Sequence, residues 1–441
     1  MKNAAVILLW IGSVSGDYHA IPERATCTEA QRQQNRAHAV TSSKFSNCPK
    51  QDWIDWFATN RECGVQQAHI LVIGGNKGFD CVGWLRMYRN SDATDDWKPS
   101  AKEWLSLLPG PDTKNTCGIC KQCLSEYPLP KRRKLSELPP TVTCVEPLPA
   151  NYDGLSKAAE SGNWPLSGLH IVHAAAALDT TLNVTFPAKA EWGREDVGIE
   201  NHVGYPGGKI SVATKTVDQL VFGVAGSKEQ PKVPTVLTID TEGFDAFVLL
   251  GAARTLSSGG VAYLEFEYHS VKPWIKMQLK WVVDYLDNFH FDCYFAGNDG
   301  LSYKVTGGCW EDKYEFHKWS NVVCASRIKI EPHTCWHDAL EIFSYGDGRF
   351  ARSHSPADEQ YEAETATEAA TEAPAEKWHS HANQNAAGSP RQFLGLKGSH
   401  SHGSSSDHGI QRGMSPDDTQ HHRPNGPAPE AAPRRHGRTT I

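Results

Sequence analysis

Short β-rich runs alternate with helical stretches between about residues 67 and 335, and this alternation constrains the fold more than any other feature. The runs rich in β-branched and apolar residues are bounded by turn residues, as strands in globular proteins are. An alternation of strands and helices is typical of an α/β sheet. The predicted strands are His69–Ile73, Val142–Val145, His170–Ala174, Thr235–Ile239 and Val261–Glu267.

The two ends of the chain differ from this central zone. Residues 1–16 have a basic start at Lys2, an apolar centre and small residues at the end, the pattern of a signal peptide. A cytosolic protein with an apolar start is the alternative. No segment is long and apolar enough to predict a stable membrane span. Residues 355–441 are rich in Ala, Glu, Gly, Ser, Pro and His and are predicted to be disordered, because they cannot bury enough apolar surface to fold.

Cysteine and charge content bound the class of protein. The twelve cysteines fit a protein of the secretory pathway, secreted or held in its lumen, because an even count favours disulfides in an oxidising compartment. The formal net charge of -7 gives no reason to expect nucleic acid as a partner. The oligomeric state stays open. Residues 17–66 form a Cys-containing N-terminal extension with a predicted short amphipathic helix, marked by Trp53, Ile54, Trp56 and Phe57.

An insertion rich in Pro, Lys and Cys spans residues 90–140 of the central zone. It contains Cys117, Cys120 and Cys123, which are predicted to be oxidised. A zinc site is the alternative, with these three thiolates completed by Cys144 or a His.

Closely spaced glycines follow the first predicted strand. Gly74, Gly75 and Gly78 are dense enough to let a backbone approach a ligand where a Cβ atom would clash. Their spacing is not the G-x-G-x-x-G of a dinucleotide fold, which disfavours a nicotinamide-dependent oxidoreductase. Glu146 ends the next predicted strand, where a carboxylate accepts both hydroxyl hydrogens of a ribose. A surface carboxylate before a proline turn is the alternative for Glu146.

Polar side chains also end the two later strands of this zone. Asp240 and Glu242 follow Thr235–Ile239, and because ligands lie beyond the carboxyl ends of strands, both are predicted to face an acceptor. The alternative is that one of them caps the helix that begins near Phe244. A divalent ion held by Asp240, Glu242 and His269 or Glu267 is chemically reasonable, but the spacing does not require it.

In the segment LEFEYH (264–269), alternation places Glu265, Glu267 and His269 on one side of the strand. His269 is predicted to be the general base, with Glu267 orienting it or holding a sugar hydroxyl. A hydrogen-bonded structural triad is the alternative.

Several of these segments together resemble the FkbM family of S-adenosylmethionine-dependent methyltransferases. They occur in the family's order: VIGGNKG (72–78), EPLPANY (146–152), HAAA (173–176), IDTEGFDA (239–246) and LEFEYH (264–269), with YFAG (294–297) and WSNVV (319–323) near the end. The resemblance covers roughly residues 67–328. It implies a class I methyltransferase fold, a Rossmann-like seven-stranded mostly parallel sheet with helices on both faces. It also implies S-adenosyl-L-methionine as the cofactor and methyl transfer, usually to oxygen.

The predicted function is an O-methyltransferase of the secretory pathway that methylates a glycan or another hydroxyl acceptor. A secreted, non-catalytic protein that keeps the fold is the alternative. One departure supports that alternative, because the family usually has an Asp where this chain has Val72. The predicted site consists of cofactor contacts from Gly74, Gly75, Asn76, Gly78, Glu146 and Ala175, catalytic groups His269, Asp240 and Glu267, and substrate contacts from Glu242 and Glu265.

Overall fold

The structure is a computed structural model, and it describes part of the chain. The described residues are 27–39, 49–60, 62–89, 101–109, 135–181, 184–194, 197–199, 207–223 and 231–345. The predicted signal peptide, the predicted disordered tail and Cys117, Cys120 and Cys123 lie outside them.

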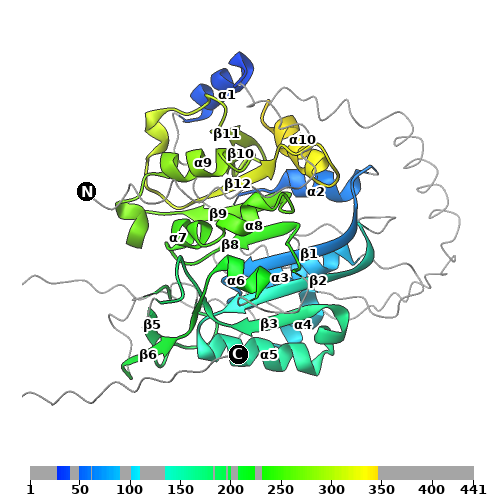
Figure 1. Cartoon of the computed structure of the whole chain (residues 1–441), viewed down its shortest axis with the longest axis vertical. Helices are drawn as coiled ribbons and strands as arrows, with labels where there is room; N and C mark the ends of the chain where they lie inside the picture. Colours follow the sequence, from blue (N-terminus) through cyan, green and yellow to red (C-terminus); the bar gives the residue numbers. More distant parts are fainter. Residues whose placement is uncertain are drawn as a thin grey trace, which may run out of the picture. The chain divides into compact units, whose positions relative to one another are not determined.

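An eight-stranded sheet organises the domain, with strand order β11-β10-β12-β9-β8-β1-β2-β3 (Figure 1). The five strands from β3 to β9 in this order are parallel, whereas β12, β10 and β11 each run antiparallel to their neighbours. The predicted α/β class with a mostly parallel sheet is therefore confirmed. The seven-strand count is wrong, because the chain turns back after β10 and adds β11 to the edge. The strands are β1 (Val65–Ile73), β2 (Ser136–Glu146), β3 (Leu169–His173), β8 (Val236–Ile239), β9 (Tyr263–Tyr268), β10 (Phe291–Ala296), β11 (Ser302–Lys304) and β12 (Ser320–Ser326).

Each of the five predicted strands overlaps a strand of this sheet. β1 and β2 begin several residues before their predicted starts, because their polar first halves pair with each other, from Val65 opposite Ser136 onward. Two two-stranded sheets stand apart from the main one: β4 (Ala175–Ala176) with β7 (Thr214–Lys215), and β5 (Val184–Pro187) with β6 (Lys209–Val212).

Helices cover both faces of the main sheet (Figure 1). One core contains Trp53, Trp84 and Trp336, and the other contains Leu237 and Phe266 on the opposite face. The predicted helix around Trp53 is confirmed as α2. The helices are α1 (Glu29–Ala39), α2 (Asp52–Thr59), α3 (Phe79–Tyr88), α4 (Ala101–Leu107), α5 (Pro149–Ser161), α6 (Val217–Phe222), α7 (Asp245–Leu250), α8 (Ala253–Ser257), α9 (Leu279–Asp287) and α10 (His333–Phe343), with short 3-10 turns η3 (Trp164–Ser167), η4 (Lys272–Ile275) and η5 (Asp312–Tyr314). Across the described residues, no helix combines the length and the apolar character that crossing a membrane requires.

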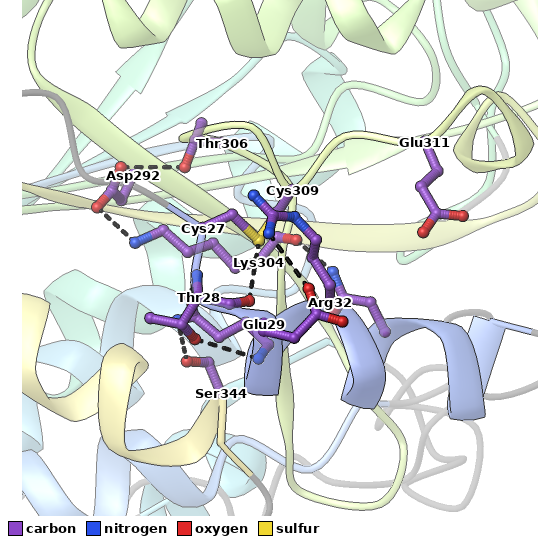
Figure 2. Close-up of a disulfide and its surroundings, with 12 residues drawn as sticks. Cys27, Thr28, Glu29, Arg32, Asp292, Lys304, Thr306, Cys309, Glu311 and Ser344 are labelled. Atoms are coloured by element: carbon purple, nitrogen blue, oxygen red, sulfur yellow. Dashed lines mark hydrogen bonds and ion pairs between the residues drawn. A yellow bond between two sulfur atoms is a disulfide. The ribbon is translucent and has the colours of Figure 1, made fainter.

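Disulfides join parts of the domain that are distant in sequence. All eight described cysteines are paired, as Cys27–Cys309 (Figure 2), Cys63–Cys335, Cys81–Cys144 and Cys293–Cys324. The first two bonds fasten the N-terminal segment to the far end of the domain. Because Cys144 is bonded to Cys81, it does not complete a zinc site with the insertion cysteines, and that form of the zinc alternative is wrong.

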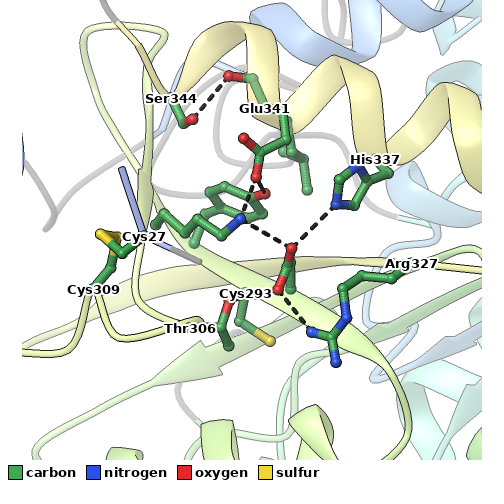
Figure 3. Close-up of polar contacts among 12 residues, drawn as sticks. Cys27, Cys293, Thr306, Cys309, Arg327, His337, Glu341 and Ser344 are labelled. Atoms are coloured by element: carbon green, nitrogen blue, oxygen red, sulfur yellow. Dashed lines mark hydrogen bonds and ion pairs between the residues drawn. A yellow bond between two sulfur atoms is a disulfide. The ribbon is translucent and has the colours of Figure 1, made fainter. Parts of the chain in front are cut away.

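A buried ion network lies where the N-terminal segment, β10, β11 and α10 meet (Figure 3). Asp292 of β10 is fully buried, and its carboxylate contacts Lys304 (3.0 Å), Arg327 (2.7 Å) and His337 (3.1 Å). Although burial opposes ionisation, the His337 hydrogen bond and the charges of Lys304 and Arg327 hold the pKa of Asp292 well below its usual range. The Lys304 ammonium also bridges to Glu341 of α10, so the network fastens that helix to the antiparallel edge of the sheet.

Candidate functional site

A pocket opens at the carboxyl ends of β1, β2, β3 and β8. The strand order reverses between β1 and β8, and open α/β sheets bind ligands at such a switch point. The predicted residues that line the pocket are Gly74, Asn76, Glu146, Ala175, Asp240 and Glu242. Gly75, Gly78, Glu265, Glu267 and His269 do not line it.

Each of the predicted cofactor-binding glycines has a packing reason. A Cβ atom on Gly74, whose φ is +91°, would lie 1.7 Å from the backbone oxygen of Asp240. A Cβ atom on Gly75 would lie 2.6 Å from Cys144 Sγ, and one on Gly78 would lie 2.7 Å from the Trp104 ring. The close approach that these glycines permit is therefore to neighbouring protein atoms, and Gly74 alone of the three also faces the pocket. Sequence reasoning missed this because a glycine run does not reveal what approaches it.

Glu146 lies at the end of β2, 3% exposed, and its carboxylate is held by the backbone. Oε2 accepts the Asn76 N–H at 2.7 Å, and Oε1 accepts the Leu148 N–H at 2.8 Å. Burial raises the pKa of Glu146 to about 7, against the opposing effect of these two hydrogen bonds and of the Asn151 side chain. The surface-carboxylate alternative is wrong. A carboxylate has about four lone-pair positions, so its two oxygens retain acceptor capacity toward the pocket.

An apolar wall lies beside Glu146. Its side chains form one small buried cluster, and those that line the pocket are Leu148, Ala175, Phe186, Val197 and Ile199. The last three follow β4 in short segments that lie outside the five predicted strands.

An acidic wall faces the pocket at the end of β8. Asp240 and Glu242 line it, and Glu242 has a φ of +55°, a conformation uncommon for a residue other than glycine. Such outliers concentrate at functional sites, where the surrounding structure maintains them. Asp240 is exposed at the pocket, and the nearby carboxylates of Glu267, Glu242 and Asp245 raise its pKa above its ordinary value.

Neither Asp240 nor Glu242 caps α7. The helix begins after Phe244 without a side-chain cap, so the capping alternative for these two residues is wrong. Asp245, in the first turn of α7, accepts a hydrogen bond from the Thr241 N–H at 3.3 Å, and its Oδ2 has no hydrogen-bond partner within the described part of the chain. Asp245 is fully buried, and burial together with Glu267 raises its pKa to about 7. Sequence reasoning did not single out Asp245, because an acid in the first turn of a helix is common.

Glu267 and His269, two of the predicted catalytic residues, form a pair behind Asp240. His269 Nε2 lies 2.6 Å from Glu267 Oε2. Burial lowers the pKa of His269, but the hydrogen bond and the charge of Glu267 outweigh it, so that the pKa is raised. Asp240, whose pKa Glu267 raises, lines the pocket.

Glu265 lies away from the pocket, where its carboxylate binds three other side chains. It accepts from Gln51 Nε2 (2.8 and 3.0 Å), Asn321 Nδ2 (2.8 Å) and the Tyr263 hydroxyl (3.1 Å). The structure therefore does not place Glu265 in the pocket. The alternation of side chains along the strand correctly places Glu265 on the same side as Glu267. Glu265 lies two residues earlier, however, and is therefore about 7 Å further from the end of the strand where the pocket opens.

The pocket carboxylates do not form a preassembled metal cluster. Within the described residues, three potential ligand atoms come within 4.8 Å of one another at Asp292, His337 and Glu341, in the ion network that Lys304 bridges. Asp240, Glu242, Glu267 and His269 form no such group.

Comparisons with known proteins found little similarity. No protein-family model and no curated protein sequence matches the chain. One solved structure that matches is the crystal structure of Methyltransferase FkbM from Methylobacillus flagellatus KT, with 10% identity and a TM-score of 0.31. The match covers 68% of this chain and 56% of that one. Similarity at this level carries no argument about fold or activity.

Proposed function

We propose that the pocket binds S-adenosyl-L-methionine and that the protein transfers its methyl group to a hydroxyl acceptor. The observation that carries the proposal is the buried Glu146 carboxylate, held by two backbone amides beside an apolar wall at the switch point of the sheet. A carboxylate at the end of this strand suits the two hydroxyls of a ribose. The apolar wall of Leu148, Ala175 and Phe186 suits the flat adenine ring next to it.

The acidic wall supports a cofactor with a positive end. S-adenosyl-L-methionine carries a sulfonium and an ammonium group, and negative or polar oxygens of Asp240 and Glu242 favour such charges in a partly desolvated pocket. Glu146, the apolar wall and the acidic wall all line one cavity. Glu146 comes from the end of β2, and Asp240 and Glu242 come from the loop after β8.

When bound, the cofactor supplies an activated methyl group, so the chain's residues need only align the acceptor and receive its proton. Asp240 in the pocket lining and the Glu267–His269 pair provide groups that hold that proton. Four disulfides fit a protein of the secretory pathway, where glycans offer abundant hydroxyl acceptors.

A non-catalytic protein with the same fold is the second candidate. Val72 favours it, because this residue lies in the core of β1 and leaves no carboxylate at a position where the resembling family has one. Methylation of a mixed glycan pool, read as a mass increase that depends on labelled cofactor, would decide between the two.

Replacing Glu146 with Ala should weaken S-adenosyl-L-methionine binding by about 1.5–3 kcal/mol, the range for hydrogen bonds to a charged group. Isothermal titration calorimetry on the oxidised full chain measures this. Glu160→Ala changes an exposed carboxylate on α5 and serves as the control, with affinity expected to match the parent. Unchanged affinity in a folded Glu146→Ala chain would remove Glu146 from the site.

A further inference from the structure

The Glu267 carboxylate accepts a second hydrogen bond that sequence reasoning did not foresee. The indole N–H of Trp319 donates to Oε1 at 2.7 Å, while Oε2 lies 2.6 Å from His269 Nε2. An indole N–H can only donate, so the oxygen it contacts acts as an acceptor and carries no proton toward it. Hydrogen bonds of this kind to an ionised carboxylate are about twice as strong as those between neutral groups.

The Glu267 carboxylate is therefore held from two sides by N–H groups of Trp319 and His269. N–H donors stabilise the ionised form of a carboxyl group, so this arrangement favours a negative charge on Glu267.

We propose that Trp319 is a positioning residue that keeps the Glu267 carboxylate ionised and oriented toward His269. The inference rests on the proposed function only in assigning the pocket as the reaction site. The ionised Glu267 then orients the His269 imidazole.

The electrostatics of the surrounding groups agree with this arrangement. Three acids face His269: Glu267 of β9, Asp245 of α7 and Glu242 of the loop after β8. Glu267 is the group in direct contact, and its own pKa is lowered, against burial, by His269, Trp319 and Asp240. Loss of the charge on Glu267 would remove the contact that favours the protonated imidazole.

The test is the pKa of His269 in the cofactor-free, oxidised full chain, followed by ¹⁵N NMR of the imidazole nitrogens and assigned with His269→Gln. The parent should titrate above the ordinary value of about 6.5. Trp319→Phe keeps an aromatic ring but removes the N–H that stabilises the charge of Glu267, so the pKa of His269 should fall by about one unit. Trp281→Phe, at a residue 63% exposed, is the matched control and should leave it unchanged.

Glu267→Gln supplies a second and independent arm. It should also lower the pKa of His269, and adding Trp319→Phe to it should change nothing more, because the two residues act through one hydrogen bond. An unchanged His269 pKa in Glu267→Gln, or in a folded Trp319→Phe chain, would overturn the proposal.

Titration of the same samples with S-adenosyl-L-methionine separates the two ideas. The expected pKa shifts in a chain that does not bind the cofactor would support the role of Trp319 and count against the proposed function. Cofactor binding without these shifts in the pKa of His269 would support the proposed function and count against the role of Trp319.

Discussion

Replacing Asp292 with Asn should lower the free energy of unfolding by about 3–5 kcal/mol, the range for breaking a buried ion pair from one side. Asp292 is fully buried, and the change would leave Lys304 and Arg327, 2% and 3% exposed at their side chains, without their shared negative partner. Asn keeps the size of the side chain, so the loss reports charge and not packing. Urea unfolding of the oxidised chain, followed by circular dichroism, measures it.

Asp284→Asn makes the same change at the surface. Asp284 pairs with Lys280 in α9, with side chains 58% and 42% exposed, and an exposed pair contributes about 0–1 kcal/mol. Similar losses in the two variants would show that the Asp292 network is no more important to the fold than a surface ion pair.

Removal of the Cys63–Cys335 disulfide is expected to be the other large change. Replacing both cysteines with Ala should cost about 2–4 kcal/mol of unfolding free energy, since a crosslink restricts the unfolded chain. The bond spans 272 residues and fastens the segment after α2 to α10. Cys27–Cys309 spans 282 residues and remains closed in this variant. Because it already joins the two ends of the domain, the loop that Cys63–Cys335 closes is shorter than the sequence separation, and the expected loss of unfolding free energy stays at about 2–4 kcal/mol.

The Cys293–Cys324 pair offers a matched comparison. It closes a separation of only 31 residues, between β10 and β12 positions that already pair in the sheet. Its replacement by two Ala residues should cost less, because loop-closure entropy grows with loop length. Thermal unfolding of both double variants orders them, and a larger loss from the β10–β12 pair would contradict the argument.

The sequence predicted best what depends on local pattern. Runs such as His69–Ile73 and Thr235–Ile239 are apolar and short, so their strands in the sheet follow from composition and turn residues alone. Strand ends then place Gly74, Glu146 and Asp240 at one edge of the sheet, where the structure has its pocket.

Features that depend on distant contacts were not predictable. The sequence predicts a substrate contact for Glu265, but its hydrogen-bond partner Gln51 is 214 residues away in the chain. Alternation along a strand shows which face a side chain is on, but not which residue of another element it contacts. Trp319 is 52 residues from Glu267, and the sequence resemblance marked its segment without a role. The ion network of Asp292 brings together residues of β10, β11 and α10 and a residue that follows β12. Because these residues are distant in the sequence, no local pattern indicates the network.

The most direct test of the central claim is photolabelling of the oxidised full chain with methyl-tritiated S-adenosyl-L-methionine, followed by peptide mapping. If the cofactor occupies the pocket at the switch point, the label should appear on peptides that contain Glu146, Ala175 or Asp240, and excess S-adenosylhomocysteine should suppress it. Label confined to peptides outside the pocket, or the same labelling in the presence of the competitor, would contradict the account.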